Sequence, residues 1–297
     1  MRRFLLSLSF ILAPLTLSLS ALPGEAEAKS KVVASFSILG DMVEQVAGDL
    51  AEVETIVGPN ADAHVYTPSV ADALAVTKAE LIFVNGLGFE TWSDTLIKTS
   101  GTKAKVIVAT KGVEPLEVDG KIDPHAWNAL TNGLIYVDNI AKALAEHDPA
   151  NAATYEQNAA AFSAQLSALH EKTKAKLAAL PQDRKTVVTA HDAFGYLANA
   201  YDLTFLAPVG IDTEAEPSAR EMASLIDQIK SKGVAALFVE NITNPALVEQ
   251  IASETGLEIG GRLFSDALSV KGGPATSYYS MFEHNLSVLV EQLNPGS

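Results

Sequence analysis

Four short stretches of the sequence each carry one side chain that can bind a metal ion. They are centred on His64, His125, His191 and Asp266. Each lies where a strand or a loop is expected to pass into the next element. Three imidazoles and one carboxylate form a donor set that suits a borderline divalent cation such as Zn²⁺. A full set of four protein ligands leaves no position for an activated water, which favours holding a metal over using it in catalysis.

The composition restricts the class of protein that can carry these residues. The chain has 297 residues, 48% hydrophobic and 19% charged, which is enough for a sizeable core and for two domains. A net charge of -15 argues against a nucleic-acid partner and gives a field that attracts cations. The sequence has no cysteine, so a metal must be bound by His, Asp, Glu or backbone oxygen.

Residues 1–28 have the pattern of a Sec-type signal peptide. Arg2 and Arg3 precede an apolar run at 4–19, and Ala26-Glu27-Ala28 has the small-residue spacing of a cleavage site. A membrane anchor is the weaker alternative, because the run is short for a span and contains Pro14. No cysteine follows the leader, so we predict a periplasmic protein that is not a lipoprotein.

Strand and helix patterns alternate along the rest of the chain, which predicts βα units on mainly parallel sheets. Strands are expected at 31–37, 51–57, 81–84, 105–109, 185–189, 203–209, 235–239 and 257–264. Helices are expected at 38–48, 90–100, 128–146, 193–201, 217–232, 244–255 and 278–293. One further helix is predicted to begin with Thr67 as its N-cap and Pro68 at its first position.

A long helix is expected from about 149 to 179. Its apolar residues recur at helical spacing, and it contains no glycine. At 1.5 Å per residue it would be about 45 Å long, enough to cross a two-lobed molecule. We therefore predict an α/β fold of two pseudo-symmetric lobes, each a mainly parallel sheet flanked by helices, joined by this rigid helix. The predicted divisions are a signal peptide at 1–28, an N-terminal lobe at 29–148, a linking helix at 149–180 and a C-terminal lobe at 181–297.

Ligands of open α/β sheets bind beyond the carboxyl ends of the strands. His191 and Asp266 follow predicted strands of the second lobe, and His64 and His125 lie in loops that precede helices of the first. All four are therefore candidates to face one cleft, two from each lobe.

Other residues compete for a role. Glu240 ends a predicted strand and could reach the cleft, either as a ligand or as a hydrogen-bonding partner of one. Asp192 is interpreted as the cap of the following helix. Gly86-Leu87-Gly88 lacks the third glycine of a dinucleotide site. The positions interpreted as structural or packing residues are His147, His170, His284, Trp92 and Trp127.

The mature chain resembles the TroA-like zinc/manganese solute-binding proteins of bacterial ABC importers. The resemblance covers residues 31–293 and rests on 62–68, 123–127, 191–196, 238–241 and 265–268. It implies two lobes joined by a rigid helix, with a metal buried between them. It also implies docking on a membrane permease driven by a cytoplasmic ATPase. The ligands that it implies are His64, His125, His191 and Asp266.

The resemblance leaves the metal open between Zn²⁺ and Mn²⁺. Family members that carry manganese usually have Glu where this chain has His191, and a third imidazole favours zinc. Many zinc-specific members have a His-rich loop between the first two ligands. Here the polar loop at 111–121 has no histidine and instead carries Glu114, Glu117 and Asp119.

We therefore predict a non-enzymatic, monomeric protein that captures Zn²⁺, or alternatively Mn²⁺, and delivers it to an ABC permease. Two other classes remain open. A metal-dependent hydrolase would need an open coordination position, and a surface adhesin would keep the fold only as a scaffold.

Overall fold

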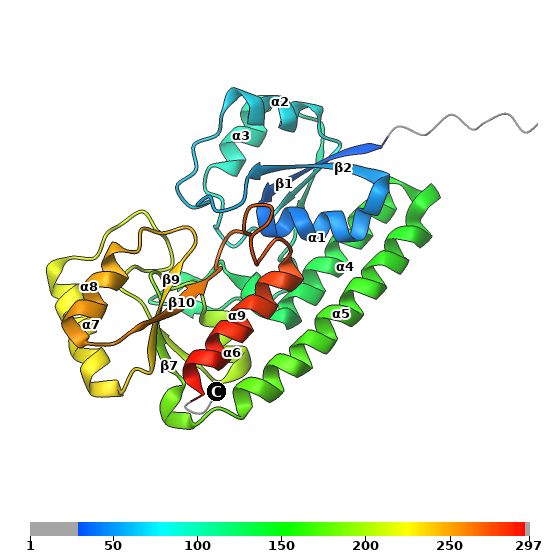
Figure 1. Cartoon of the computed structure of the whole chain (residues 1–297). Coiled ribbons are helices and arrows are strands. Elements are labelled where there is room, and N and C mark those ends of the chain that lie inside the picture. Colours follow the sequence, from blue (N-terminus) through cyan, green and yellow to red (C-terminus); the bar gives the residue numbers. More distant parts are fainter. Residues whose placement is uncertain (1–28, 295–297) are drawn as a thin grey trace, which may run out of the picture.

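The computed structural model describes residues 29–294, so the predicted signal peptide lies outside the described part. Two four-stranded sheets form the two lobes (Figure 1). The first contains β1 (Ser30–Phe36), β2 (Ala51–Val57), β3 (Leu81–Val84) and β4 (Lys105–Val108). The second contains β7 (Thr186–Val188), β8 (Thr204–Leu206), β9 (Ala236–Glu240) and β10 (Ile259–Leu263).

The two sheets have the same topology. Their orders are β2-β1-β3-β4 and β10-β9-β7-β8, and every pairing in them is parallel. The strands of each sheet can be numbered one to four in chain order. Read from the β2 edge in the first sheet and from the β8 edge in the second, both sheets then have the strand order two, one, three, four. The predicted fold of two pseudo-symmetric α/β lobes is confirmed.

Helices cover the faces of both sheets. Those of the first half are α1 (Ser37–Ala47), α2 (Val70–Lys78), α3 (Ser93–Ser100) and α4 (Leu130–His147). Those after the linker are α6 (Gly195–Tyr201), α7 (Ala219–Lys232), α8 (Ala246–Thr255) and α9 (Tyr278–Leu293). Short 3₁₀ turns lie at Gly48–Leu50, Ala126–Asn128, Pro149–Asn151 and Gln182–Arg184. None of the helices in residues 29–294 is long and apolar enough to span a membrane.

The long linking helix is α5 (Ala152–Ala178), which runs along one side of the molecule from the first lobe to the second (Figure 1). It packs against α1 and α4 of the first lobe and against α6 and α9 of the second. Its buried stripe consists of Tyr155, Ala159, Phe162, Leu166, Leu169, Thr173 and Leu177. This buried stripe is continuous along the helix. The helix therefore packs against the hydrophobic core of both lobes and connects them. The residue boundaries assigned to the lobes and the linker stay predictions.

Three local predictions were wrong. The α2 helix begins at Val70 rather than Pro68, because Ser69 and Asp72 form a reciprocal capping box that places Pro68 in the preceding loop. Asp192 does not cap the next helix, which begins at Gly195. The polar loop at 111–121 contains most of a small antiparallel hairpin, β5 (Glu117–Val118) and β6 (Lys121–Ile122).

A buried carboxylate ties α9 back to the first lobe. Asp41, on α1, accepts a hydrogen bond from the backbone N–H of Tyr278, the first residue of α9, at 2.7 Å. Burial raises the pKa of Asp41 from 3.8 to about 6, although the hydrogen bonds from Tyr278 and Gln45 act in the opposite direction. The folded protein therefore binds this proton more tightly than the unfolded chain, so stability falls as pH rises through this range.

We predict that Asp41→Asn weakens this pH dependence. Asparagine keeps an oxygen that can accept the Tyr278 N–H but cannot ionise. At about 1.4 kcal/mol per pH unit, the whole pKa shift corresponds to about 3 kcal/mol, and the wild type should lose about 2 kcal/mol of this relative to the variant between pH 3.8 and 6. Denaturant unfolding across this pH range measures the difference. Asp227→Asn, at an exposed position of α7, is the control. Parallel curves for wild type and Asp41→Asn would contradict the assignment.

Candidate metal centre

His64 lies in the loop between β2 and α2, and three contacts hold that loop. The Asp62 Oδ1 atom accepts the backbone N–H of His64 at 2.9 Å. The indole Nε1 of Trp92 donates to the carbonyl of Ala63 at 2.8 Å. The His64 ring meets Phe89 edge-on, with ring centroids 4.8 Å apart. These contacts leave Nε2 of His64 to face the space between the lobes.

His125 follows the β5–β6 hairpin and repeats the same local pattern. The Asp123 Oδ1 atom accepts the backbone N–H of His125 at 2.9 Å and lies 2.7 Å from its Nδ1. A carboxylate two residues before the histidine thus closes an Asx turn and also orients the ring. The free Nε2 atom points away from Asp123 and toward the second lobe.

His191 and Asp266 follow strands β7 and β10 of the second lobe. Glu240, at the end of the intervening strand β9, accepts the backbone N–H groups of Ala190 and His191 through Oε1, at 2.8 and 2.9 Å. Its Oε2 lies 2.6 Å from Nδ1 of His191, an ion-pair contact whose angles are not those of a hydrogen bond. Asp266 is preceded by Ser265, whose carbonyl accepts the indole N–H of Trp127 at 2.8 Å.

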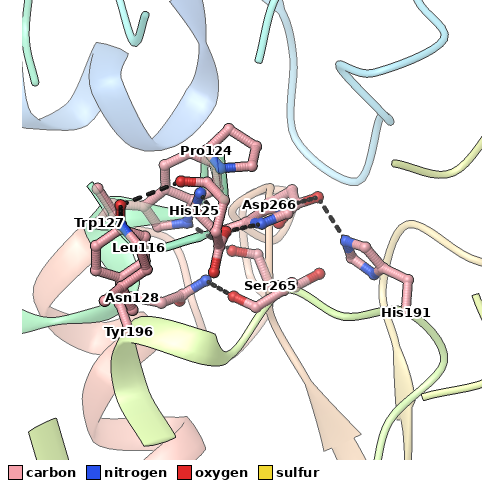
Figure 2. Close-up of polar contacts among 12 residues, drawn as sticks. Leu116, Pro124, His125, Trp127, Asn128, His191, Tyr196, Ser265 and Asp266 are labelled. Carbon is pink, nitrogen blue, oxygen red and sulfur yellow. Dashed lines mark hydrogen bonds and ion pairs between the residues drawn. The ribbon is translucent and has the colours of Figure 1, made fainter. Parts of the chain in front are cut away.

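The four predicted side chains converge, with one donor atom of each lying within 4.8 Å of all the others. The Oδ2 atom of Asp266 is 3.2 Å from Nε2 of His64, 3.1 Å from that of His191 and 3.7 Å from that of His125. Nε2 of His64 is 3.2 Å from Nε2 of His125. Four bonds of about 2.1 Å in a tetrahedron would place donors about 3.4 Å apart, so these spacings suit such a cation. Figure 2 shows the His191 ring directed at the Asp266 carboxylate.

The cluster is almost completely buried. His125, His191 and Asp266 have no exposed surface, and His64 is 6% exposed. Burial alone would raise the pKa of Asp266, but the His125 and His191 imidazoles and the hydrogen bonds from His191 and His64 hold it well below 3.8. Burial would lower the pKa of His191, but Glu240 and Asp266 outweigh it and raise that pKa well above 6.5.

The ligand candidate Asp266 has bonding capacity left over. Oδ1 of Asp266 is buried and has no hydrogen-bond partner within residues 29–294. Such an atom is costly to bury unless it meets a donor or a cation. The donor set therefore fits a divalent cation, which would also offset the charge of the surrounding carboxyl groups when they are ionised.

The other candidates lie outside the cluster. Glu240 contacts a ligand candidate and is not within the four-residue group. The remaining three histidines make contacts elsewhere: His147 with Glu80, His170 with Tyr201, and His284 with the carbonyl of Arg262. Asp192 donates its backbone N–H to the carbonyls of Val209 and Gly210.

Sequence reasoning missed the role of Asp123. The signal was present, because the spacing Asp-x-His occurs at both 62–64 and 123–125. In both places the first residue accepts the backbone N–H of the histidine at 2.9 Å. A repeated local turn of this kind could have predicted the partner of the ligand as well as the ligand.

Contacts between the lobes lie beside the cluster. The Tyr196 hydroxyl, on α6, donates to the carbonyl of Asp123 at 3.1 Å and accepts the N–H of Leu116 at 3.0 Å. Asn128 donates to the carbonyl of Ala193 at 3.0 Å. Figure 2 shows Tyr196 and Asn128 on the side of His125 away from His191. The lobes are therefore in direct contact on this side of the cluster.

Two lobes of one topology, a long connecting helix and a buried His/Asp cluster between the lobes define a substrate-binding protein of the metal-transporting class. The family model described as "ZnuA: Zinc-uptake complex component A periplasmic" matches residues 32–292, and the chain belongs to this family. The family comprises solute-binding proteins rather than enzymes, so the chain is a metal-binding component of an ABC transporter. Such a component implies a permease and an ATPase as partners.

Known relatives cover nearly the whole chain but are named for different metals. "Iron-binding protein YfeA" of Yersinia pestis is 33% identical over 276 residues, which cover 91% of this chain and 88% of that protein. "Manganese ABC transporter substrate-binding lipoprotein scaA" of Streptococcus gordonii is 34% identical over 300 residues, 97% of each. The structure of the periplasmic zinc binding protein TroA from Treponema pallidum matches with a TM-score of 0.86 and 28% identity, covering 90% of this chain and all of that one.

The prediction that the protein is not a lipoprotein is corrected by these relatives. The scaA protein, which matches along 97% of this chain, is named a lipoprotein, as are several other relatives. The prediction rested on the absence of a cysteine after the leader at 1–28. Lipid attachment concerns that end of the chain and leaves the metal-binding fold unchanged, so the fold of residues 29–294 carries no information about it. An extracytoplasmic location fits the family description.

We predict that Gly195→Ala weakens metal binding. A Cβ at Gly195 would lie 2.5 Å from Oδ2 of Asp123, the carboxylate that orients His125. The carboxylate must then move, and loss of such a partner typically lowers metal affinity about 10- to 100-fold. Chelator competition with Zn²⁺ measures the dissociation constant. Gly210→Ala is the matched control, since nothing lies within 4 Å of its added Cβ. Unchanged affinity in Gly195→Ala would show that Asp123 does not orient the site.

Proposed function

We propose that this protein captures a divalent transition metal, preferentially Zn²⁺, between its lobes and delivers it to an ABC permease as a monomer. The proposed ligands are His64, His125, His191 and Asp266. The observation that supports the proposal is the approach of three imidazole Nε2 atoms and one carboxylate oxygen to within 4.8 Å of one another in a buried position.

The donor set favours zinc over manganese. Three nitrogens and one oxygen match the tetrahedral, nitrogen-rich sites that Zn²⁺ prefers, whereas Mn²⁺ prefers oxygen donors and more of them. Mn²⁺ remains the second candidate because of one feature of the site. The unpaired Oδ1 of Asp266 would allow this carboxylate to bind through both oxygens, giving a shell of three nitrogens and two oxygens.

The depth of the site sets how the metal enters and leaves. His64 is the one proposed ligand with exposed surface, and it lines a cavity of about 310 Å³ together with Phe89, Pro124 and Ile211. This cavity is the proposed entry route for the ion. Because the other three side chains are fully buried, we infer that release to the permease requires the lobes to move apart.

Exchanging one ligand should change the metal preference. His191→Glu replaces a nitrogen donor by oxygen, so we expect the ratio of Zn²⁺ to Mn²⁺ affinity to fall by about tenfold or more. His191→Ala should lose affinity for both ions with the fold intact. Metal analysis of protein purified without added metal, followed by competition between the two ions, measures this. A ratio that stays constant in His191→Glu would remove His191 from the ligand set.

Metal affinity should rise with pH. The metal must displace a proton from His191, whose pKa is raised well above 6.5 in the metal-free protein because Glu240 and Asp266 outweigh the effect of burial. Lower pH keeps the proton bound, so the Zn²⁺ dissociation constant should increase as pH falls through and below neutrality. Competition titrations between pH 5.5 and 8.5 test this, with His191→Ala expected to flatten the curve above pH 6.5. An affinity independent of pH in the wild type would contradict imidazole ligation.

A further inference from the structure

Three of the four proposed ligands share a feature of the backbone. The carbonyl of the residue immediately before each one accepts a hydrogen bond from a side-chain N–H in a different segment of the chain. The three pairs are Trp92 Nε1 to Ala63 at 2.8 Å, Asn85 Nδ2 to Pro124 at 2.9 Å, and Trp127 Nε1 to Ser265 at 2.8 Å.

The Trp127 contact differs from the other two because it joins the lobes. Trp92 and Asn85 each hold a loop of their own lobe. Trp127 lies two residues after His125, in the first lobe, and holds the residue before Asp266, in the second. One side chain therefore connects the backbones that carry two proposed ligands, whose Nε2 and Oδ2 atoms are 3.7 Å apart.

The surroundings of Trp127 pack closely around its indole. The side chain is completely buried. Its ring lies against Phe36 and Phe89, with centroids 4.9 and 4.7 Å away, and 5.4 Å from the His125 ring. The carbonyl of Trp127 also accepts the hydroxyl of Tyr278 at 2.6 Å. Tyr278 begins α9, so the segment that carries Asp266 is bound to Trp127 at both of its ends.

We propose that Trp127 is a positioning residue that sets the spacing of His125 and Asp266 across the lobe interface through its indole N–H. The inference rests on the proposed function and adds a residue that touches no metal. Ligands held in place before the ion arrives lose less conformational freedom when it binds, so affinity depends on what holds them. Removing the N–H frees the Ser265 carbonyl and the adjoining Asp266 without changing any ligand.

The test compares Trp127→Phe with Tyr155→Phe. Both variants remove one hydrogen-bond donor from a fully buried aromatic side chain, but the hydroxyl of Tyr155 bonds Asp148 at 2.9 Å, away from the cluster. Three quantities are measured on the full chain: the melting temperature of the metal-free protein, the Zn²⁺ dissociation constant by chelator competition, and the visible absorption of bound Co²⁺, which reports the coordination geometry.

We expect both variants to lower the melting temperature, and Trp127→Phe alone to raise the Zn²⁺ dissociation constant about 10- to 100-fold and to change the Co²⁺ spectrum. Wild-type affinity and spectrum in Trp127→Phe would overturn the proposal. So would an equal loss of affinity in Tyr155→Phe, because the effect would then follow general stability.

A second variant covers the case in which Trp127→Phe does not fold. Benzothienylalanine at position 127 keeps the shape of the indole and replaces only the N–H by sulfur. It should reproduce the loss of affinity, and wild-type affinity in this variant would again overturn the proposal. Failure of the proposed function is distinguishable, because the wild type would then bind no Zn²⁺ or would keep its affinity in His125→Ala.

Discussion

The structure depends on the close approach of one buried carboxylate to three imidazoles. Asp266 has no exposed surface, and its Oδ2 lies between 3.1 and 3.7 Å from Nε2 of all three histidines. A carboxylate in such a place is unfavourable without compensating partners. The imidazoles supply part of the compensation, and a divalent cation at their centre would supply more. The features that surround the cluster maintain this approach between segments that are far apart in the chain.

Two levels of support hold the four side chains. The first is topological, because the carboxyl ends of parallel strands in the second lobe deliver His191 and Asp266 to one edge, while loops of the first lobe deliver His64 and His125 opposite them. The second is local. Carboxylates at Asp123 and Glu240 contact the Nδ1 atoms of two histidines, which directs their Nε2 atoms toward the centre. Each of these carboxylates also accepts the backbone N–H of the same histidine, so one group sets both the ring orientation and the local backbone position.

The relation between the lobes is restrained by groups of different kinds. The α5 helix packs on both lobes, and Asp41 holds the start of α9 from α1. Nearer the cluster, the Trp127 indole makes one hydrogen bond across the interface and the Tyr196 hydroxyl makes two. A long packed helix is a continuous restraint, whereas single hydrogen bonds can break one at a time. This arrangement is compatible with a binding protein that must hold its ion firmly and later release it.

The sequence by itself determined the class of fold, the connecting helix and the identity of the four converging side chains. These follow from local patterns: alternating strand and helix periodicity, an uninterrupted apolar stripe, and His or Asp placed just beyond strands or just before helices. Local capping was less predictable. The start of α2 depended on whether Thr67 or Ser69 was the N-cap residue. The reciprocal capping hydrogen bonds between Ser69 and Asp72 decided it.

Only the tertiary structure decided how the four residues meet. No spacing along the chain shows that Glu240 contacts Nδ1 of His191 from a neighbouring strand, or that Trp127 reaches across to Ser265. Those contacts join residues between 49 and 138 positions apart. They arise from strand order and from the packing of one lobe on the other, and a one-dimensional pattern does not encode either.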